Sequence, residues 1–239
     1  MAREAVIVQS LRTGLTKAHR GSFNITEPVD YLAHTMKEAV ASVPNLDPAE
    51  IEDVIVGTGF PEGCQGMNMA RIAAMAAGFP KEVAGTTVNR FCSSGSQAVM
   101  MAAQSIINEG ADVAIGAGVE TITMMQDGSQ NTTRLANAAA QERFPGLYFP
   151  MGLTAEIVAE RYGISREDQD AFAVRSQQRA ARAQAEGRFA KEIVPVTIPQ
   201  RKGDPIIVDQ DEHIRGDTTI EALAKDTFHC HSGSVLRTT

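Results

Sequence analysis

The sequence predicts an α/β fold built around a mainly parallel sheet. Short runs rich in Val and Ile alternate with segments of helical periodicity along the first half of the chain. Alternation of this kind favours parallel strands joined by right-handed helical crossovers. Residues 93–108 are apolar on almost every side, which predicts a helix buried between layers or at a subunit contact.

Four apolar runs mark the expected strands of this layer, at residues 4–10, 53–59, 83–91 and 112–119. Helices are expected at residues 29–43, from Asp47 onward, and at 68–77 and 93–108. In the first of these, apolar residues recur on one helical face. Asp47 and Pro48 suit the N-cap and the first helical position. Glycines 78 and 110 are typical of the residue that ends a helix.

The amino-acid composition of the sequence changes near Glu120. Residues 121–150 are rich in Thr, Asn, Gln and Met without a clear period, and they are too long for an ordinary loop, so we expect a functional insertion. Two helices should follow, at 154–162 and 165–186, the second capped by Ser165. Strands are expected at 193–198 and 205–208.

Composition excludes several classes of protein. A chain of 239 residues with 43% hydrophobic and 21% charged residues has the profile of one or two globular domains. The net charge of −7 and the lack of a basic stripe argue against nucleic acid as the main partner. No apolar run reaches the roughly 18 residues of a membrane span, and the N-terminus does not resemble a signal peptide. We therefore expect a cytoplasmic protein with no membrane partner.

Cys92 has the most informative position in the chain. It lies where an expected strand ends and an expected helix begins, in the run N-R-F-C-S-S-G-S of residues 89–96. Unpaired N–H groups at a helix N-terminus stabilise a thiolate and can hold an oxyanion. The small residues after Cys92 leave room for an acyl group. From position alone, both a nucleophile and a buried structural cysteine remain open.

Several motifs in order give the chain a resemblance to the amino-terminal part of a thiolase. Residues 89–98 (N-R-F-C-S-S-G-S-Q-A) are similar to the nucleophile motif of this family. Further similar stretches are residues 116–121 (G-A-G-V-E-T), 151–156 (M-G-L-T-A-E), 165–176, 187–195 and 209–215. The resemblance covers residues 4–225 and implies that Cys92 is the catalytic nucleophile.

The resemblance implies ping-pong acyl transfer without a cofactor, because CoA and acyl-CoA are substrates. A Cys92 thiolate would attack the 3-keto carbonyl of a 3-ketoacyl-CoA, acetyl-CoA would leave, and a second CoA would take the acyl group from the cysteine. Thioester exchange between two sulfurs is nearly thermoneutral, whereas a serine ester would be harder to return to CoA. Thiolysis of a 3-ketoacyl-CoA and the reverse condensation of acetyl-CoA are both implied.

The resemblance also implies a thiolase-like layered fold of which this chain has the first α/β half and the loop domain, with the second half absent. We expect a nucleophile layer at residues 1–120, a CoA-binding loop domain at 121–225 and a divergent tail at 226–239. Thiolases carry their acid/base His and Cys in G-H-P and C-x-G-x-G segments, and neither motif occurs here. A truncation or frameshift after Lys225 is our hypothesis, and we expect impaired activity.

Two further residues match substrate-binding positions of the family. Arg215 corresponds to a contact of the nucleotide end of CoA, with an ordinary surface Arg as the alternative. Met151 corresponds to a wall residue near the pantetheine, with core packing as the alternative. Pro150 stands where acetoacetyl-type thiolases tend to have His, which favours the 3-ketoacyl-CoA type.

No metal site is expected. His229, Cys230 and His231 alternate at the end of the chain, but they offer three ligands without a partner cluster. CoA thioesters are the expected partners, together with a second copy of the chain in a homodimer or homotetramer. Two other functions stay open: an inert thiolase-like fragment that only binds acyl-CoA or dimerises, and a ketoacyl synthase, which shares a cysteine at a helix start.

Overall fold

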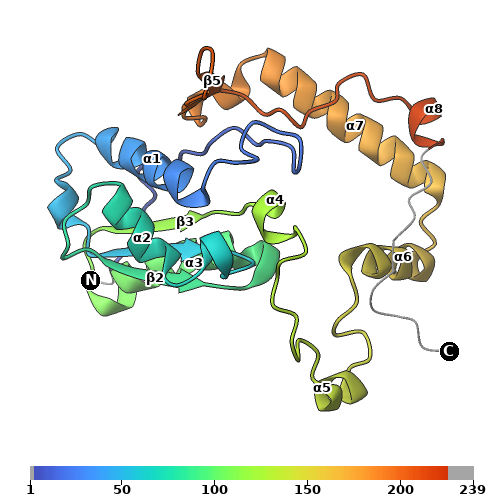
Figure 1. Ribbon diagram of the computed structural model, residues 1–239, viewed down its shortest axis with the longest axis horizontal. Coiled ribbons are helices and arrows are strands. Elements are labelled where there is room, and N and C mark those ends of the chain that lie inside the picture. The colour runs from blue at the N-terminus through green and yellow to red at the C-terminus, as the bar shows by residue number, and fades with distance from the viewer. Residues whose placement is uncertain (1–2, 226–239) are drawn as a thin grey trace. The chain divides into compact units, whose positions relative to one another are not determined.

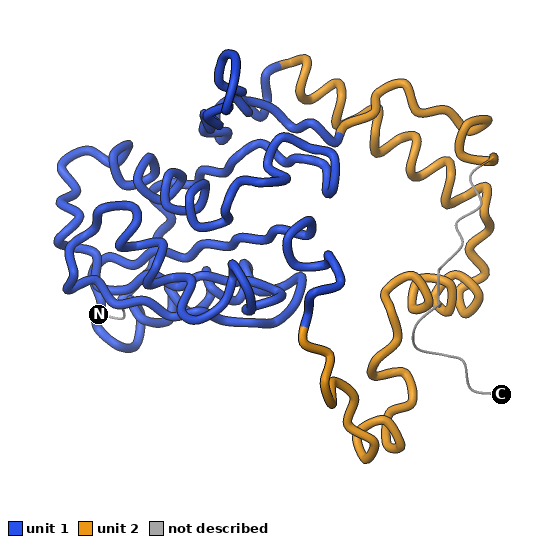
Figure 2. Tube along the Cα trace, viewed as in Figure 1, with its two compact units in different colours: residues 1–130, 187–213 blue, residues 131–186, 214–239 orange. Residues whose placement is uncertain are grey.

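The computed structural model describes residues 3–225 and divides the chain into two compact units. The first consists of Met1–Gln130 and Gly187–His213, and the second of Asn131–Glu186 and Ile214–Thr239 (Figure 2). Residues 187–213 belong to the first unit, and the expected division of the chain at residue 120 stays a prediction. The expected CoA-binding role of residues 121–225 stays a prediction.

A three-stranded parallel sheet forms the centre of the first unit (Figure 1). Its strands are β1 (Asp53–Gly57), β2 (Ala84–Val88) and β3 (Ala114–Gly118), in the order β2-β1-β3. Asp53 pairs with Ala84 on one side and with Ala114 on the other, so the three strands begin and end level. This confirms the α/β class and three of the four strands expected in this half.

Helices cover both faces of this sheet. Successive side chains of β1 point to opposite faces, and the apolar side chains on each face pack against helices. Val54 and Val56 pack in one cluster with α1 (Pro28–Ala41) and α2 (Met69–Ala76), and both valines are fully buried. Ile55 packs in another with Ala98 and Ala102 of α3 (Ser94–Gln104). The small residues on α3 let the helix lie close to the sheet.

The short elements of the first unit are connectors. They are η1 (Pro48–Glu50), η2 (Gly63–Gln65), η3 (Phe91–Ser93), the π-helical turn η4 (Ser105–Glu109), α4 (Ile122–Met125) and η5 (Arg188–Lys191). The expected Asp47 cap is confirmed, since its side chain accepts a hydrogen bond from Ala49 N. The expected end at Gly110 is also confirmed, in the left-handed conformation with φ 90°.

The strand predicted at residues 4–10 is wrong. Residues 4–10 form neither strand nor helix, and Val6, Ile7 and Val8 are 68%, 78% and 72% exposed. Side chains anchor its ends: Arg3 binds Asp112 and two backbone carbonyls, and Gln9 binds Ser42. An apolar β-prone run becomes a strand only where another strand offers hydrogen bonds, and among residues 3–225 this segment has no such neighbour.

A hairpin of β4 (Val196–Ile198) and β5 (Ile206–Val208) completes the first unit and confirms the last two expected strands in shorter form. Val196, Ile198 and Val208 pack with Phe23 and Tyr31, and the two rings stack with centroids 4.9 Å apart. Residues from both ends of the chain therefore share one small core.

The second unit is helical where it is described. Its helices are α5 (Ala138–Arg143), α6 (Met151–Tyr162), α7 (Arg166–Ala185) and α8 (Ile220–Leu223). The predicted Ser165 cap is confirmed, because its hydroxyl accepts from Asp168 N at 3.1 Å. Among the described residues of this unit, only Asp170 is buried. Its Oδ1 lies 2.9 Å from Nε of Arg166. Within the described residues, no helix has both the length and the apolarity needed to cross a membrane.

Candidate active site

Cys92 lies at the junction predicted from sequence, between the end of β2 and the start of α3. The intervening turn, η3, is a 3-10 turn with Cys92 at its centre, and the thiol is exposed. Phe91, which precedes it, adopts φ 46° and is 68% exposed. A bulky residue in the left-handed region costs of order 1–3 kcal/mol, so the surrounding contacts must hold this turn in place.

Ser94 is the residue that holds the turn. It is 3% exposed, and its hydroxyl donates to the Phe91 carbonyl at 2.6 Å. The same oxygen accepts from Arg90 N at 2.8 Å and lies 3.3 Å from the Thr58 carbonyl at the end of β1. Asn89 adds a further support, because its side-chain oxygen accepts from Phe91 N at 2.8 Å. The backbone on both sides of Cys92 is thereby fixed to the sheet.

Glycines bring the N-terminus of α3 close to the strand ends. A Cβ at Gly57 would lie 2.3 Å from the carbonyl oxygen of Ser94, and a Cβ at Gly118 would lie 3.2 Å from Cα of Gly95. The contact at Gly57 leaves no room for any side chain. The contact at Gly118 is tight, so a side chain there would require the neighbouring backbone to shift. The partial positive charge of the α3 N-terminus therefore lies at the carboxyl ends of β1 and β3, beside Cys92.

A polar network that the sequence analysis missed joins the same strand ends. Gln65 is fully buried, and its amide nitrogen donates to Thr58 Oγ1 at 3.0 Å and to the Glu120 carboxylate. Its amide oxygen accepts from Thr121 N at 2.6 Å, and Gly59 N donates to Glu120 at 2.6 Å. These bonds join the loop after β1 to the loop after β3, which are the two segments beside the Cys92 turn.

The two predicted substrate-binding residues belong to the second unit. Met151 begins α6 and is 69% exposed. Arg215 is exposed, and its backbone N–H donates to Gln177 Oε1 at 2.7 Å. Cys92 belongs to the first unit, so the grouping of these three residues in one CoA site stays a prediction.

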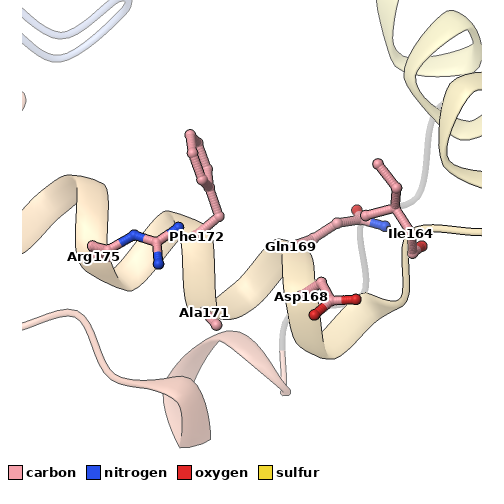
Figure 3. A pocket seen from close by; sticks show the side chains of 6 residues that line it. All are labelled: Ile164, Asp168, Gln169, Ala171, Phe172 and Arg175. Atoms are coloured by element: carbon pink, nitrogen blue, oxygen red, sulfur yellow. Dashed lines mark hydrogen bonds between the residues drawn. The ribbon is translucent and has the colours of Figure 1, made fainter. Parts of the chain in front are cut away.

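A pocket in the second unit lies along α7 (Figure 3). Its lining residues are Ile164, Asp168, Gln169, Ala171, Phe172 and Arg175. The Phe172 ring extends away from the helix, and the Arg175 guanidinium carbon is 5.7 Å from its centroid. Such a surface offers cation–π and apolar contacts but no nucleophile. Among residues 3–225, no three His, Cys, Asp or Glu side chains are grouped to hold a metal.

Comparison with known proteins decides the family. The family model for the thiolase N-terminal domain matches residues 5–238, which includes the Cys92 turn and extends past Lys225. The chain belongs to the thiolase family. It is 43% identical to the 3-ketoacyl-CoA thiolase of Bacillus subtilis (strain 168) over 93% of this chain and 58% of that protein. It is 44% identical to the peroxisomal 3-ketoacyl-CoA thiolase 2 of Arabidopsis thaliana, over 93% and 49%.

The thiolase fold is supported by a solved structure. The chain superposes on the acetyl-CoA acetyltransferase of Bacillus anthracis with a TM-score of 0.81 and 34% identity, covering 94% of this chain and 58% of that one. A β-ketoadipyl-CoA thiolase of Acinetobacter baylyi is 41% identical over 93% of this chain and 59% of the relative. The chain thus spans about half the length of the curated relatives it matches.

Proposed function

We propose that this chain carries the nucleophile of an acyl-CoA:CoA C-acyltransferase and that Cys92 forms the acyl-S-cysteine intermediate. One observation supports this most directly: an exposed thiol at the centre of a constrained turn that leads into α3, in a chain of the thiolase family. The exposure of Cys92 argues against the alternative of a buried structural cysteine.

The chemistry follows from the position of Cys92. Its thiolate attacks the 3-keto carbonyl of a 3-ketoacyl-CoA, and the resulting oxyanion lies near the positive N-terminus of α3. The bond between C2 and C3 then breaks. The electron pair goes to the acetyl-CoA fragment, which takes up a proton and leaves, and the acyl group stays on Cys92. The thiolate of a second CoA attacks this thioester, and the Cys92 thiolate is released.

The proton steps need an acid and a base near Cys92. In thiolases these groups lie in G-H-P and C-x-G-x-G segments, which the sequence of this chain does not contain. The acylation half-reaction transfers an acyl group from CoA to Cys92 without forming a carbanion, so it tests the nucleophile separately from these proton steps.

Substrate binding and assembly are part of the same proposal. Arg215 would pair with the nucleotide end of CoA, and Met151 would line the pantetheine channel. Pro150, at the N-cap of α6, offers no side-chain hydrogen bond there, which favours 3-ketoacyl substrates with longer chains. We also propose a homodimer or homotetramer in the cytoplasm.

Assay of acetoacetyl-CoA thiolysis tests the function. Turnover by the purified chain that disappears in Cys92→Ala supports the proposal, and the matched control Cys64→Ala should keep it. Turnover that persists in Cys92→Ala would overturn the assignment. A chain that binds CoA but neither turns over acetoacetyl-CoA nor becomes acylated at Cys92 would instead be an inert acyl-CoA binder. Light scattering after size exclusion measures the oligomer.

A further inference from the structure

In the first unit, the sulfur of Cys64 lies close to the sulfurs of two methionines. The Cys64 sulfur lies 3.8 Å from Sδ of Met124 and 3.8 Å from Sδ of Met125. Cys64 is at the centre of η2, and the two methionines end α4, so the three ligands come from segments 60 residues apart in the sequence. We propose that Cys64, Met124 and Met125 form a binding site for a soft monovalent cation, Cu(I) or its redox-inert analogue Ag(I).

The spacing fits a metal ion. With metal–sulfur bonds of about 2.3 Å, three sulfur ligands around one ion are about 3.8–4.0 Å apart in tetrahedral or trigonal geometry. The two Cys64 distances already have this value.

The chemistry of the donors selects the ion. One thiolate and two thioethers are soft ligands, and thioethers favour Cu(I) over Zn²⁺, which prefers thiolate and imidazole. Binding exchanges the thiol proton for the metal: the S–H bond breaks, an S–metal bond forms, and the proton goes to solvent. No electron is transferred, and the two thioether sulfurs each donate a lone pair.

Met125 and the α4 backbone are held in place before any ion binds. Met125 is 3% exposed, and a Cβ at Gly63 would lie 3.6 Å from its Sδ and its methyl carbon, so the thioether packs directly against η2. Thr123 ties α4 to the opposite loop, because its hydroxyl accepts from His19 N at 2.9 Å and donates to Asn24 at 3.2 Å. Cys64 itself is exposed, which leaves an entry path for the ion.

The surrounding charges favour a cation as well. Partial burial raises the pKa of the Cys64 thiol, and the carboxylates of Glu27, Asp127 and Glu120 raise it further. Tyr31 is the other titratable group coupled to this thiol, and burial keeps its phenol protonated by raising its pKa. Three carboxylates around a neutral thiol leave a negative potential, which a monovalent cation relieves.

The experiment uses the full chain with Cys92→Ser and Cys230→Ser, which leaves Cys64 as its one thiol. Ag(I) is titrated in against a competing ligand, while the 13C-labelled methionine methyl groups are followed by NMR. We expect one equivalent to bind, with shifts at Met124 and Met125. Adding Met124→Leu and Met125→Leu together should weaken binding at least tenfold, whereas Met100→Leu, an exposed methionine of α3, should leave it unchanged.

Each alternative result overturns the proposal. Equal affinity with and without the two Met→Leu changes would mean that Cys64 binds as a single ligand. Methyl shifts at other methionines, or binding that survives Cys64→Ser, would place the ion elsewhere. Leu and Met have similar volumes, so the double variant should fold, and its thermal unfolding transition checks this. None of these results depends on acyl transfer at Cys92.

Discussion

The Ser94 hydroxyl donates a hydrogen bond to the Phe91 carbonyl at 2.6 Å and so spans the turn that carries Cys92. The same oxygen accepts from Arg90 N at 2.8 Å. One buried side chain thus satisfies two backbone groups of a turn whose Phe91 has a strained φ of 46°. Cys92 is exposed, whereas the backbone on either side of it is held by hydrogen bonds.

Ser94→Ala should therefore loosen the Cys92 turn. The substitution removes the hydrogen bonds of the Ser94 hydroxyl to Arg90 N and to the Phe91 carbonyl, each worth about 0.5–1.5 kcal/mol of unfolding free energy. Urea unfolding measures this loss. Ser96→Ala, at an exposed serine of the same helix, is the control and should change the free energy by less than about 0.5 kcal/mol. Equal stability of the two variants would contradict the role given to Ser94.

Gly57→Ala should displace the N-terminus of α3 from the sheet. The added Cβ would meet the Ser94 carbonyl oxygen at 2.3 Å, and overpacking of this kind costs about 1–3 kcal/mol or more. Gly95→Ala is the matched control on the helix itself, since the nearest atom to its new Cβ is 3.9 Å away. Helix propensity makes Gly95→Ala neutral or stabilising by up to about 1 kcal/mol. The opposite order of stabilities would refute the close approach of α3.

Gln65→Leu should destabilise the first unit by about 2–4 kcal/mol. Leucine fills the space but leaves Thr121 N and the Phe60 carbonyl without the partner that Gln65 supplies. Gln97→Leu, at a partly exposed position of α3, provides the comparison and should have little effect. Chemical denaturation of both variants measures the difference. If Gln65→Leu proved as stable as the parent, the network between the two loops would not contribute to stability.

The ion pair of Arg12 and Asp211 should make the first unit sensitive to acid. Arg12 Nη1 lies 2.7 Å from Asp211 Oδ1. Burial acts to raise the pKa of Asp211, but the hydrogen bonds from Arg12 and from Leu15 N outweigh burial and hold this pKa below its usual value. A carboxyl with a lowered folded-state pKa stabilises the fold above its unfolded pKa of about 3.9, and this contribution is lost as pH falls through the folded value.

Asp211→Asn tests this ion pair. The thermal unfolding temperature of the parent should decrease when the pH is lowered below about 4. Asp211→Asn should have a lower unfolding temperature at neutral pH, and that temperature should decrease less on acidification. Asp209→Asn, at an exposed carboxyl two residues away, serves as the control. A parallel acid response of the parent and Asp211→Asn would remove Asp211 from the explanation.

Local signals in the sequence predicted much of this fold. The apolar run at residues 53–59, the glycine at 110 and the Ser165 cap are signals that span only a few residues, and each is confirmed. The strand at residues 4–10 failed because a strand needs a hydrogen-bonding neighbour, which a local pattern does not reveal.

The candidate site also combines features set by local sequence with contacts between distant segments. The position of Cys92 between a strand end and a helix start could be predicted because both signals lie within a few residues of it. Gln65 and Glu120 are 55 residues apart, and their contact depends on the alignment of β1 with β3. The approach of Met124 and Met125 to Cys64 is likewise non-local. A buried Gln has no distinguishing signal in a single sequence, so such networks become visible only in the fold.

Acylation of Cys92 tests the central claim most directly. The purified chain is incubated with acetyl-CoA, the reaction is quenched in acid, and peptide mass spectrometry locates the acetyl group while released CoA is quantified. We predict one acetyl group on Cys92 and one CoA released per chain, with neither product in Cys92→Ser. Modification of Cys64 alone, or acetylation of Cys92 no faster than that of a free peptide of residues 89–96, would contradict the account.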